Sequence, residues 1–82
     1  MHADTLSRVA MRLAEYGVPS AYFSAMLRSA GGSDCELHDR GNNLVVAVKW
    51  LRGAPVVAVR QMVPLGSGCA DLQRDLDVIL SS

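Results

Sequence analysis

The sequence lacks a net charge, a long apolar run and a targeting segment. Its eight basic and eight acidic residues cancel, so the chain has no overall field that would attract nucleic acid or acidic lipid. No apolar run approaches the roughly 18 residues that a membrane helix requires. Residues 1–17 carry charges throughout and therefore do not resemble a signal peptide. We expect a cytoplasmic protein that does not contact a membrane.

Cysteine is scarce, and potential metal ligands are badly spaced. We expect the two cysteines, Cys35 and Cys69, to be reduced. Asp34, Glu36 and His38 share one face of a predicted strand. However, strand residues two positions apart lie roughly 6.5 to 7 Å from each other, too far for adjacent ligands of one ion. We therefore expect no metal site.

Residue sets that are typical of enzymes are also missing. No carboxylate pair and no Ser/His/Asp set stands out along the chain. The turn at residues 66–68, Gly-Ser-Gly, lacks the lysine and the longer glycine pattern of a phosphate loop. Cys69 lies near a predicted helix N-terminus, but it has no evident histidine partner to activate it. We expect a protein that is not an enzyme and that binds no cofactor.

The strongest structural signal is a pair of valine-rich runs separated by residues 52–55, Arg-Gly-Ala-Pro. Short runs rich in β-branched residues around such a turn predict a β-hairpin. A two-residue loop at 53–54 would need the backbone amide of Pro55 to close it, and proline has none. We therefore expect a four-residue loop that sets Leu51 opposite Val56.

A third strand is predicted just upstream, at residues 34–39, where polar and apolar residues alternate before a turn at 40–43. The expected register pairs Asp39 with Leu44, Leu37 with Val46, Cys35 with Val48, Glu36 with Ala47 and Asp34 with Lys49. One register thus aligns an apolar face and pairs opposite charges, and a slip by one residue would spoil both. The strands 34–39, 44–51 and 56–63 should form an antiparallel meander.

Helical periodicity predicts two helices before the sheet and one after it. The first begins near an N-cap at Asp4 and stops at Gly17. The second, 21–30, begins after Ser20 as its cap, and the third covers 69–80. Large side chains expected in the core include Tyr16, Tyr22, Phe23, Met26 and Trp50. Residues 1–82 are therefore predicted to form a single α+β domain with the order α-α-β-β-β-α, which begins with an αα-hairpin.

The two N-terminal helices also have the spacing of a helix-turn-helix DNA reader. The positions that match the motif are Tyr16, Gly17, Val18, Phe23 and Met26. The polar contacts available for DNA on the second helix are Ser20, Ser24 and Arg28, with no basic stripe to neutralise phosphates. We favour a plain αα-hairpin and keep a DNA-binding regulator as the alternative.

The order of elements is similar to that of double-stranded RNA-binding domains, which run α-β-β-β-α. That resemblance implies an RNA-binding surface that includes a lysine-rich start of the last helix. Here the last helix carries Asp71, Asp75 and Asp77 instead, so RNA binding does not carry over. In size and neutrality the chain resembles phage-encoded inhibitors such as anti-CRISPRs, and also antitoxins and secretion chaperones.

The third predicted strand lies at an edge of the sheet and its outward residues are largely apolar. An exposed strand of this kind tends to pair with another chain, and the alternative is that the last helix covers this edge. The residues expected to bind a partner are Val45, Lys49, Leu51, Val56, Ala58, Arg60 and Met62. We therefore interpret the chain as a small non-catalytic protein-binding module, an inhibitor or adaptor of a larger complex, that also forms a homodimer.

Overall fold

The computed structural model describes residues 2–66 and 68–82, and within them it contains the helices and strands that the sequence predicts. In chain order these elements are α1 (His2–Glu15), α2 (Ser20–Ala30), β1 (Cys35–Asp39), the short 3-10 helix η1 (Arg40–Asn42), β2 (Leu44–Leu51), β3 (Ala54–Gln61) and α3 (Ala70–Leu80). The predicted α+β class and α-α-β-β-β-α order are confirmed. Ser67, in the glycine-rich turn considered above as a phosphate loop, lies outside the described residues.

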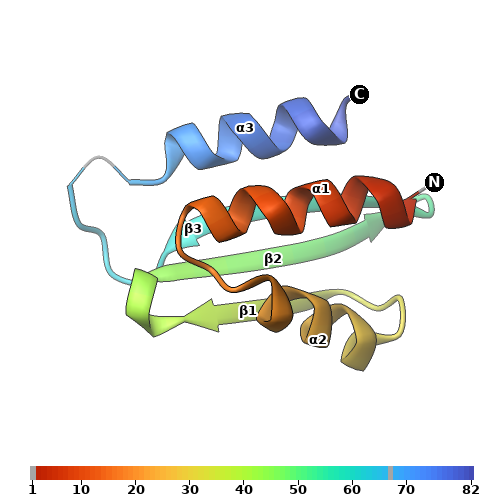
Figure 1. Ribbon diagram of the computed structural model, residues 1–82, viewed down its shortest axis with the longest axis horizontal. Helices are drawn as coiled ribbons and strands as arrows, with labels where there is room; N and C mark the ends of the chain where they lie inside the picture. Colours follow the sequence, from red (N-terminus) through yellow and green to blue (C-terminus); the bar gives the residue numbers. More distant parts are fainter. Residues whose placement is uncertain (1, 67) are drawn as a thin grey trace.

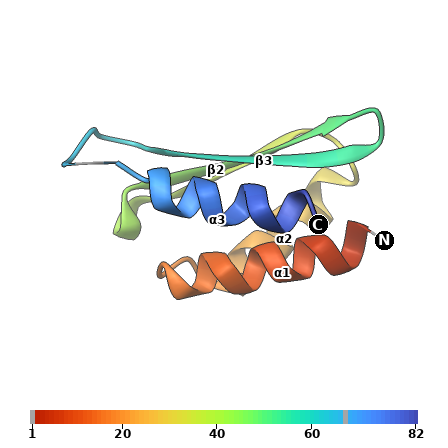
Figure 2. The ribbon, with the colours of Figure 1, turned by 90° about the horizontal axis from the view of Figure 1, so that it is seen from above.

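The molecule has two layers, one of strands and one of helices. The sheet has the order β1-β2-β3, so β1 and β3 are its edges. All three helices pack on the same side of it, as Figure 2 shows. In Figure 1, α2 lies over β1, α1 runs across the middle, and α3 lies beside β3. The opposite face of the sheet therefore has no helix against it in the described part of the chain.

Helix boundaries differ from the predicted ones by a residue or two. The first helix starts at His2, so Asp4 lies in its first turn and not at the cap, where its carboxylate is still favoured by the helix dipole. Pro19 occupies the cap of α2 and Ser20 is the first helical residue, without a side-chain capping bond. Cys69 is the N-cap of α3, which begins one residue later than expected.

Gly17 ends the first helical segment for two physical reasons. Its φ of +93° lies in the left-handed region, which side chains with a Cβ rarely adopt. A Cβ at this position would also lie 2.6 Å from Oδ1 of Asn42, whose Nδ2 donates a 2.9 Å hydrogen bond to the Gly17 carbonyl. The α1–α2 turn is thus tied to the turn between β1 and β2.

The two tyrosines are more exposed than the sequence predicted. Tyr22 is 54% exposed, because it lies about 100° around the helix from Phe23, the fully buried residue of α2. Tyr16 follows the end of α1 and is exposed too, with its hydroxyl donating a 3.1 Å hydrogen bond to the Asp75 carboxylate. The expectation that both rings belong to the core was wrong.

The first hairpin has the register that the sequence predicts. Cys35 lies opposite Val48, Leu37 opposite Val46 and Asp39 opposite Leu44. Asp34 lies just before β1, and its Oδ1 accepts a 2.9 Å hydrogen bond from the backbone amide of Trp50. The predicted ion pair of Asp34 with Lys49 is not among the ion pairs of the described residues.

The second hairpin corrects the predicted register. Its loop has two residues, Arg52 and Gly53, and Leu51 lies opposite Ala54, not opposite Val56. Both loop residues have positive φ, 52° and 79°, as a type I′ turn requires. The objection to a two-residue loop concerned the missing amide of Pro55. The actual loop begins one residue earlier and is closed by Ala54, which has an amide.

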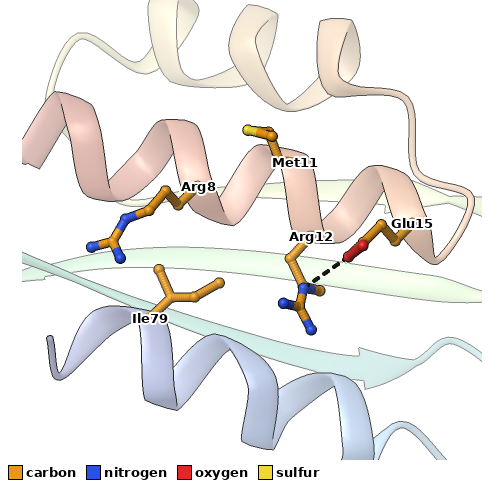
Figure 3. Close-up of a pocket in the computed structure, with 5 residues that line it drawn as sticks. All are labelled: Arg8, Met11, Arg12, Glu15 and Ile79. Atoms are coloured by element: carbon orange, nitrogen blue, oxygen red, sulfur yellow. Dashed lines mark ion pairs between the residues drawn. The ribbon is translucent and has the colours of Figure 1, made fainter.

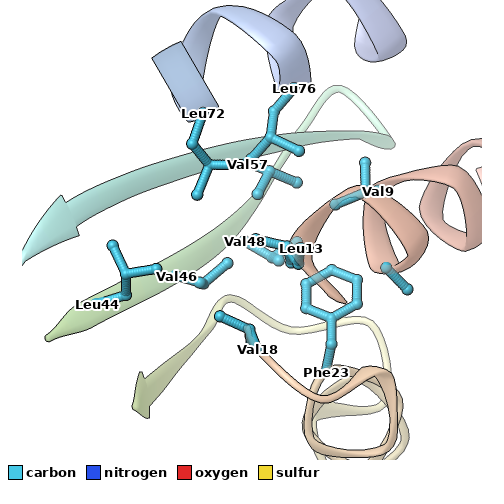
Figure 4. Packing of buried hydrophobic residues seen from close by; sticks show 11 residues of the cluster. Val9, Leu13, Val18, Phe23, Leu44, Val46, Val48, Val57, Leu72 and Leu76 are labelled. Atoms are coloured by element: carbon cyan, nitrogen blue, oxygen red, sulfur yellow. The ribbon is translucent and has the colours of Figure 1, made fainter. Parts of the chain in front are cut away.

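A shift of two residues leaves every β3 side chain on the face that was predicted for it, because side chains alternate with a period of two. The core is one cluster between the sheet and the helices, as Figure 4 shows. Its buried members are Val9, Ala10, Leu13, Val18, Phe23, Leu44, Val46, Val48, Val57, Leu72 and Leu76. The strands contribute alternate residues to this cluster, so the residues between them point to the other face.

Candidate functional site

The open face is the side of the sheet that faces away from the helices (Figure 2). Register and strand alternation place ten residues on it: Glu36 and His38 of β1, Val45, Ala47, Lys49 and Leu51 of β2, and Ala54, Val56, Ala58 and Arg60 of β3. Six of the seven residues that the sequence predicted as partner contacts are in this set. The seventh, Met62, follows β3 and is half-buried, with its amide donating a 3.1 Å hydrogen bond to the Asn43 carbonyl.

The apolar part of the open face lies at the hairpin end. Leu51 is 59% exposed and Val56 is 42% exposed. Val56 lies directly opposite Lys49, and Leu51 opposite Ala54. Two exposed aliphatic side chains on neighbouring strands form a small apolar strip that no described element covers.

Val45 is an exception among the predicted contacts. It lies on the open face but is only 1% exposed. Its cross-strand neighbours are His38 on one side and Arg60 on the other, and long side chains of this kind cover apolar surface with their stems. Val45 therefore supports these two side chains and is not itself available to a partner.

A shallow hollow lies near the centre of the open face. Ala47 and Ala58 face each other there across β2 and β3. They form part of the lining of a cavity of about 220 Å³, together with Lys49, Arg60 and Glu36. Small side chains at the centre and long charged ones around it create the depression.

Charges on this face are unequally satisfied. Glu36 Oε1 lies 2.9 Å from Nε2 of His38. This hydrogen bond holds the pKa of Glu36 below its usual range, and the positive charges of Arg60 and Lys49 lower it further. By contrast, the side chains of Lys49, Arg60 and Arg52 at the hairpin tip form no ion pair or hydrogen bond with the residues described in the structure.

The edge of β3 is occupied by a side chain from α3. The backbone amide of Val59 donates to Oε1 of Gln73 at 2.8 Å, and Nε2 of Gln73 donates to the Val57 carbonyl at 3.0 Å. Nε2 also donates to Asp77 at 2.9 Å, which fixes the orientation of the amide. Gln73 thus makes the two hydrogen bonds that one residue of an added strand would make.

These bonds also show which backbone groups of β3 face outward. Those of Val57 and Val59 point away from β2, so by alternation the amide of Ala58 belongs to the β2–β3 ladder. By the same alternation, the backbone nitrogen of Pro55 points away from β2. The missing amide of proline therefore costs no hydrogen bond between β2 and β3. The sequence predicted either strand pairing at this edge or a covering last helix, and in the structure α3 packs beside β3 with Gln73 bonded to its outward backbone groups.

The residues of the DNA-binding alternative line a groove between α1 and α2. Ser20, Ser24 and Arg28 border a cavity of about 530 Å³ together with Phe23 and Leu27 of the same helix. Ser24 is partly buried. A reading helix presents its polar face to the major groove; here Ser20 and Arg28 are exposed at the border of the groove with α1, and Ser24 is partly buried in it.

A second helical groove lies between α1 and α3. Arg8, Met11, Arg12, Glu15 and Ile79 line a cavity of about 380 Å³, shown in Figure 3. The guanidinium of Arg12 is paired with Glu15 at 2.9 Å and with Asp75, from α3, at 3.0 Å. This groove therefore has less unsatisfied charge than the open face.

Chemistry-bearing groups are dispersed. Among residues 2–66 and 68–82, no three His, Cys, Asp or Glu side chains come together as a group that could hold a metal ion. Burial and the nearby Asp34 charge raise the pKa of the Cys35 thiol, which disfavours the reactive thiolate near neutral pH. None of the described helices has the length and apolar character needed to cross a membrane.

Sequence reasoning missed Gln73 because glutamine at a helical position gives no signal of what it contacts. The sequence placed Arg52 in the hairpin loop, as the structure does, but did not include it among the partner contacts. Comparison of the chain with protein-family models, with curated proteins and with solved structures finds no match in any of the three.

Proposed function

We propose that this protein is a non-catalytic protein-binding module that uses the open face of its sheet. The observation that carries the proposal is an uncovered sheet face with exposed Leu51 and Val56 beside the unpaired cations Lys49 and Arg60. Apolar side chains without a covering element commonly mark interaction surfaces. A module that binds without chemistry fits an inhibitor or an adaptor of a larger complex.

A protein ligand is favoured over nucleic acid by the composition of this face. It carries no Phe, Tyr or Trp on which bases could stack, and Trp50, from the same hairpin, lies on the helix-covered face. The chain has no net charge, so it lacks the broad basic surface that phosphate binding needs.

The experiment compares captured proteins for the wild type and two matched variants. Leu51→Asp places a charge on the open face, and Val78→Asp places the same charge on α3, where Val78 is 63% exposed. We expect a protein captured from a nuclease-treated lysate of the source to be lost with Leu51→Asp and retained with Val78→Asp. Equal capture by all three proteins, or capture of nothing, would contradict the proposal.

Self-association is measured in the same preparation by size exclusion with light scattering. The sequence predicted a homodimer through β3, and a dimer that uses the open face would dissociate in the Leu51→Asp variant. A dimer that persists there would point to another surface.

The DNA-binding alternative is tested separately with Arg28→Glu. A regulator that uses Ser20, Ser24 and Arg28 binds duplex DNA with a steep salt dependence and loses that binding when Arg28 is reversed. The protein-binding module leaves duplex DNA unbound at every salt concentration. Duplex binding that Arg28→Glu abolishes would replace our proposal with the alternative.

A further inference from the structure

We propose that the partner of the open face is the acidic surface of a different protein, and that one of its carboxylates enters the hollow over Ala47 and Ala58, between Lys49 and Arg60. This inference rests on the proposed function and adds the chemistry of the partner to it. Aliphatic side chains next to that carboxylate would pack on Leu51 and Val56.

The charged side chains around the hollow on this face are mostly positive. Its one acid, Glu36, is hydrogen-bonded to the ring of His38 at 2.9 Å and lies beside two cations, Lys49 and Arg60. Lys49 and Arg60 have neither an ion pair nor a side-chain hydrogen bond among the described residues. Two cations thus stand against one carboxylate around the hollow, so its net charge is positive and the complementary group on a partner is a carboxylate.

The two cations lie on opposite sides of the hollow. Lys49 and Val45 are four residues apart on β2, and Val45 lies opposite Arg60. The two cations are therefore offset by roughly 13 Å along the strands, with the pair Ala47 and Ala58 midway between them. Both side chains are long enough to reach an anion bound over the alanines, where no Cγ atom blocks the approach.

Both charged and apolar side chains surround the hollow. Its volume of about 220 Å³ is bordered by charged side chains on both strands, and the exposed Leu51 and Val56 lie next to it toward the hairpin tip. A site of this kind combines a charge-assisted contact with apolar contact. That combination favours a protein surface over a free anion, which would leave the aliphatic side chains exposed.

A second copy of the chain fits this face less well. Two open faces brought together would place Lys49, Arg52 and Arg60 of one copy against the same cations of the other. Like charges across an interface suppress association. The only carboxylate that a copy could offer from the open face is that of Glu36, which is held by His38.

The test uses a displayed library of short random peptides as the probe, selected on the immobilised wild-type protein. We expect the selected peptides to be rich in Asp or Glu beside aliphatic residues. Their affinity should fall at least about tenfold for the double variant Lys49→Glu/Arg60→Glu and should weaken with added salt. Basic or uncharged selected peptides would overturn the inference.

The control variant is Arg28→Glu, which reverses an exposed charge on α2, in the other layer. It should leave peptide affinity within about twofold, since distant surface charges are largely screened. Thermal unfolding is measured for every variant, and affinities are compared at a temperature at which all of them are folded. A loss of affinity then reports a change of the surface and not of the fold. A loss of the same size for Arg28→Glu would overturn the specific role of Lys49 and Arg60.

The outcomes separate this inference from the proposed function. Suppose that the peptides lose affinity for Leu51→Asp but not for Lys49→Glu/Arg60→Glu. The open face would then still be the binding surface, but the inference that its partner is acidic would be overturned. Peptides that bind equally to all variants would overturn both. Dimerisation abolished by Lys49→Glu/Arg60→Glu, or duplex DNA binding abolished by it, would identify a second copy or a nucleic acid as the occupant and overturn the inference.

Discussion

The two faces of this sheet are built from the same strands, yet they differ in burial and in charge pairing. On the covered face, Val46, Val48 and Val57 are buried against helices and have their contacts within the chain. On the open face, Leu51 and Val56 remain exposed and the neighbouring cations have no partner. Alternation along a strand thus places residues that stabilise the fold on one face and exposed residues that could contact a partner on the other.

The largest expected effect comes from placing the same charge on each face. Val48→Asp would bury a carboxylate without a partner and should destabilise the fold by at least about 4 kcal/mol. Val56→Asp leaves its charge in water and should cost about 1 kcal/mol or less. Urea unfolding measures both. A Val56→Asp variant as unstable as Val48→Asp would mean that the open face is covered in solution.

The next effect concerns the edge of β3. Gln73→Glu removes the donor to the Val57 carbonyl and sets a second carboxylate beside Asp77. We expect a loss of about 1–3 kcal/mol in the free energy of unfolding. The control is Arg74→Met, at the exposed residue next to Gln73 in α3, and it should cost about 0.5 kcal/mol or less. Equal losses for the two variants would show that Gln73 does not stabilise the edge.

Gln73→Met tests whether Gln73 protects the edge of β3 from other chains. The variant leaves the outward backbone groups of Val57 and Val59 without their hydrogen bonds and adds no charge. Unpaired strand edges tend to pair with other chains. We therefore expect self-association that rises with protein concentration, measured by light scattering, in this variant more than in Arg74→Met. A monomeric Gln73→Met protein would mean that other features of β3, such as Pro55, are enough to block strand pairing.

A smaller effect tests the corrected loop. Arg52 adopts a φ of 52°, which asparagine tolerates better than arginine. Arg52→Asn should stabilise the fold by about 0.5 kcal/mol, as measured by thermal or urea unfolding. A four-residue loop would not require positive φ at this position, so a destabilised variant would contradict the two-residue loop.

The smallest effect is the pH dependence of Glu36. Its pKa is lowered in the folded protein, first by the hydrogen bond from His38. The corresponding stabilisation is therefore present above the ordinary pKa of a glutamate and is lost as the pH falls through the lowered value. In His38→Ala, the pKa of Glu36 measured by NMR should rise toward its usual range, whereas His2→Ala should leave it unchanged. An unshifted titration in His38→Ala would contradict the hydrogen bond.

Much of the fold could be predicted because it depends on patterns within short segments. Alternation in residues 35–39 and 44–51 determined both faces and the register of the first hairpin. The predicted register of the second hairpin differs from the actual one by two residues. A two-residue loop at 53–54 was excluded because Pro55 would have to close it, whereas the loop at 52–53 is closed by Ala54. The assignment of faces survived that error because the shift was even.

The candidate site was only partly predictable, because exposure depends on neighbours from other segments. Leu51, Val56 and Arg60 were correctly placed on one face, but the burial of Val45 depends on His38 and Arg60 beside it. The contact of Gln73 with β3 joins residues far apart in sequence. Such contacts leave no mark in the pattern of either segment.

The measurement that tests the central claim most directly is an amide NMR spectrum of the labelled protein with and without a captured partner or a selected peptide. The account predicts shifts that centre on Ala47, Lys49, Ala58 and Arg60, with Met11 and Ile79 in the α1–α3 groove unchanged. Shifts concentrated in that groove, or along α2 at Ser24 and Arg28, would contradict the open face as the binding surface.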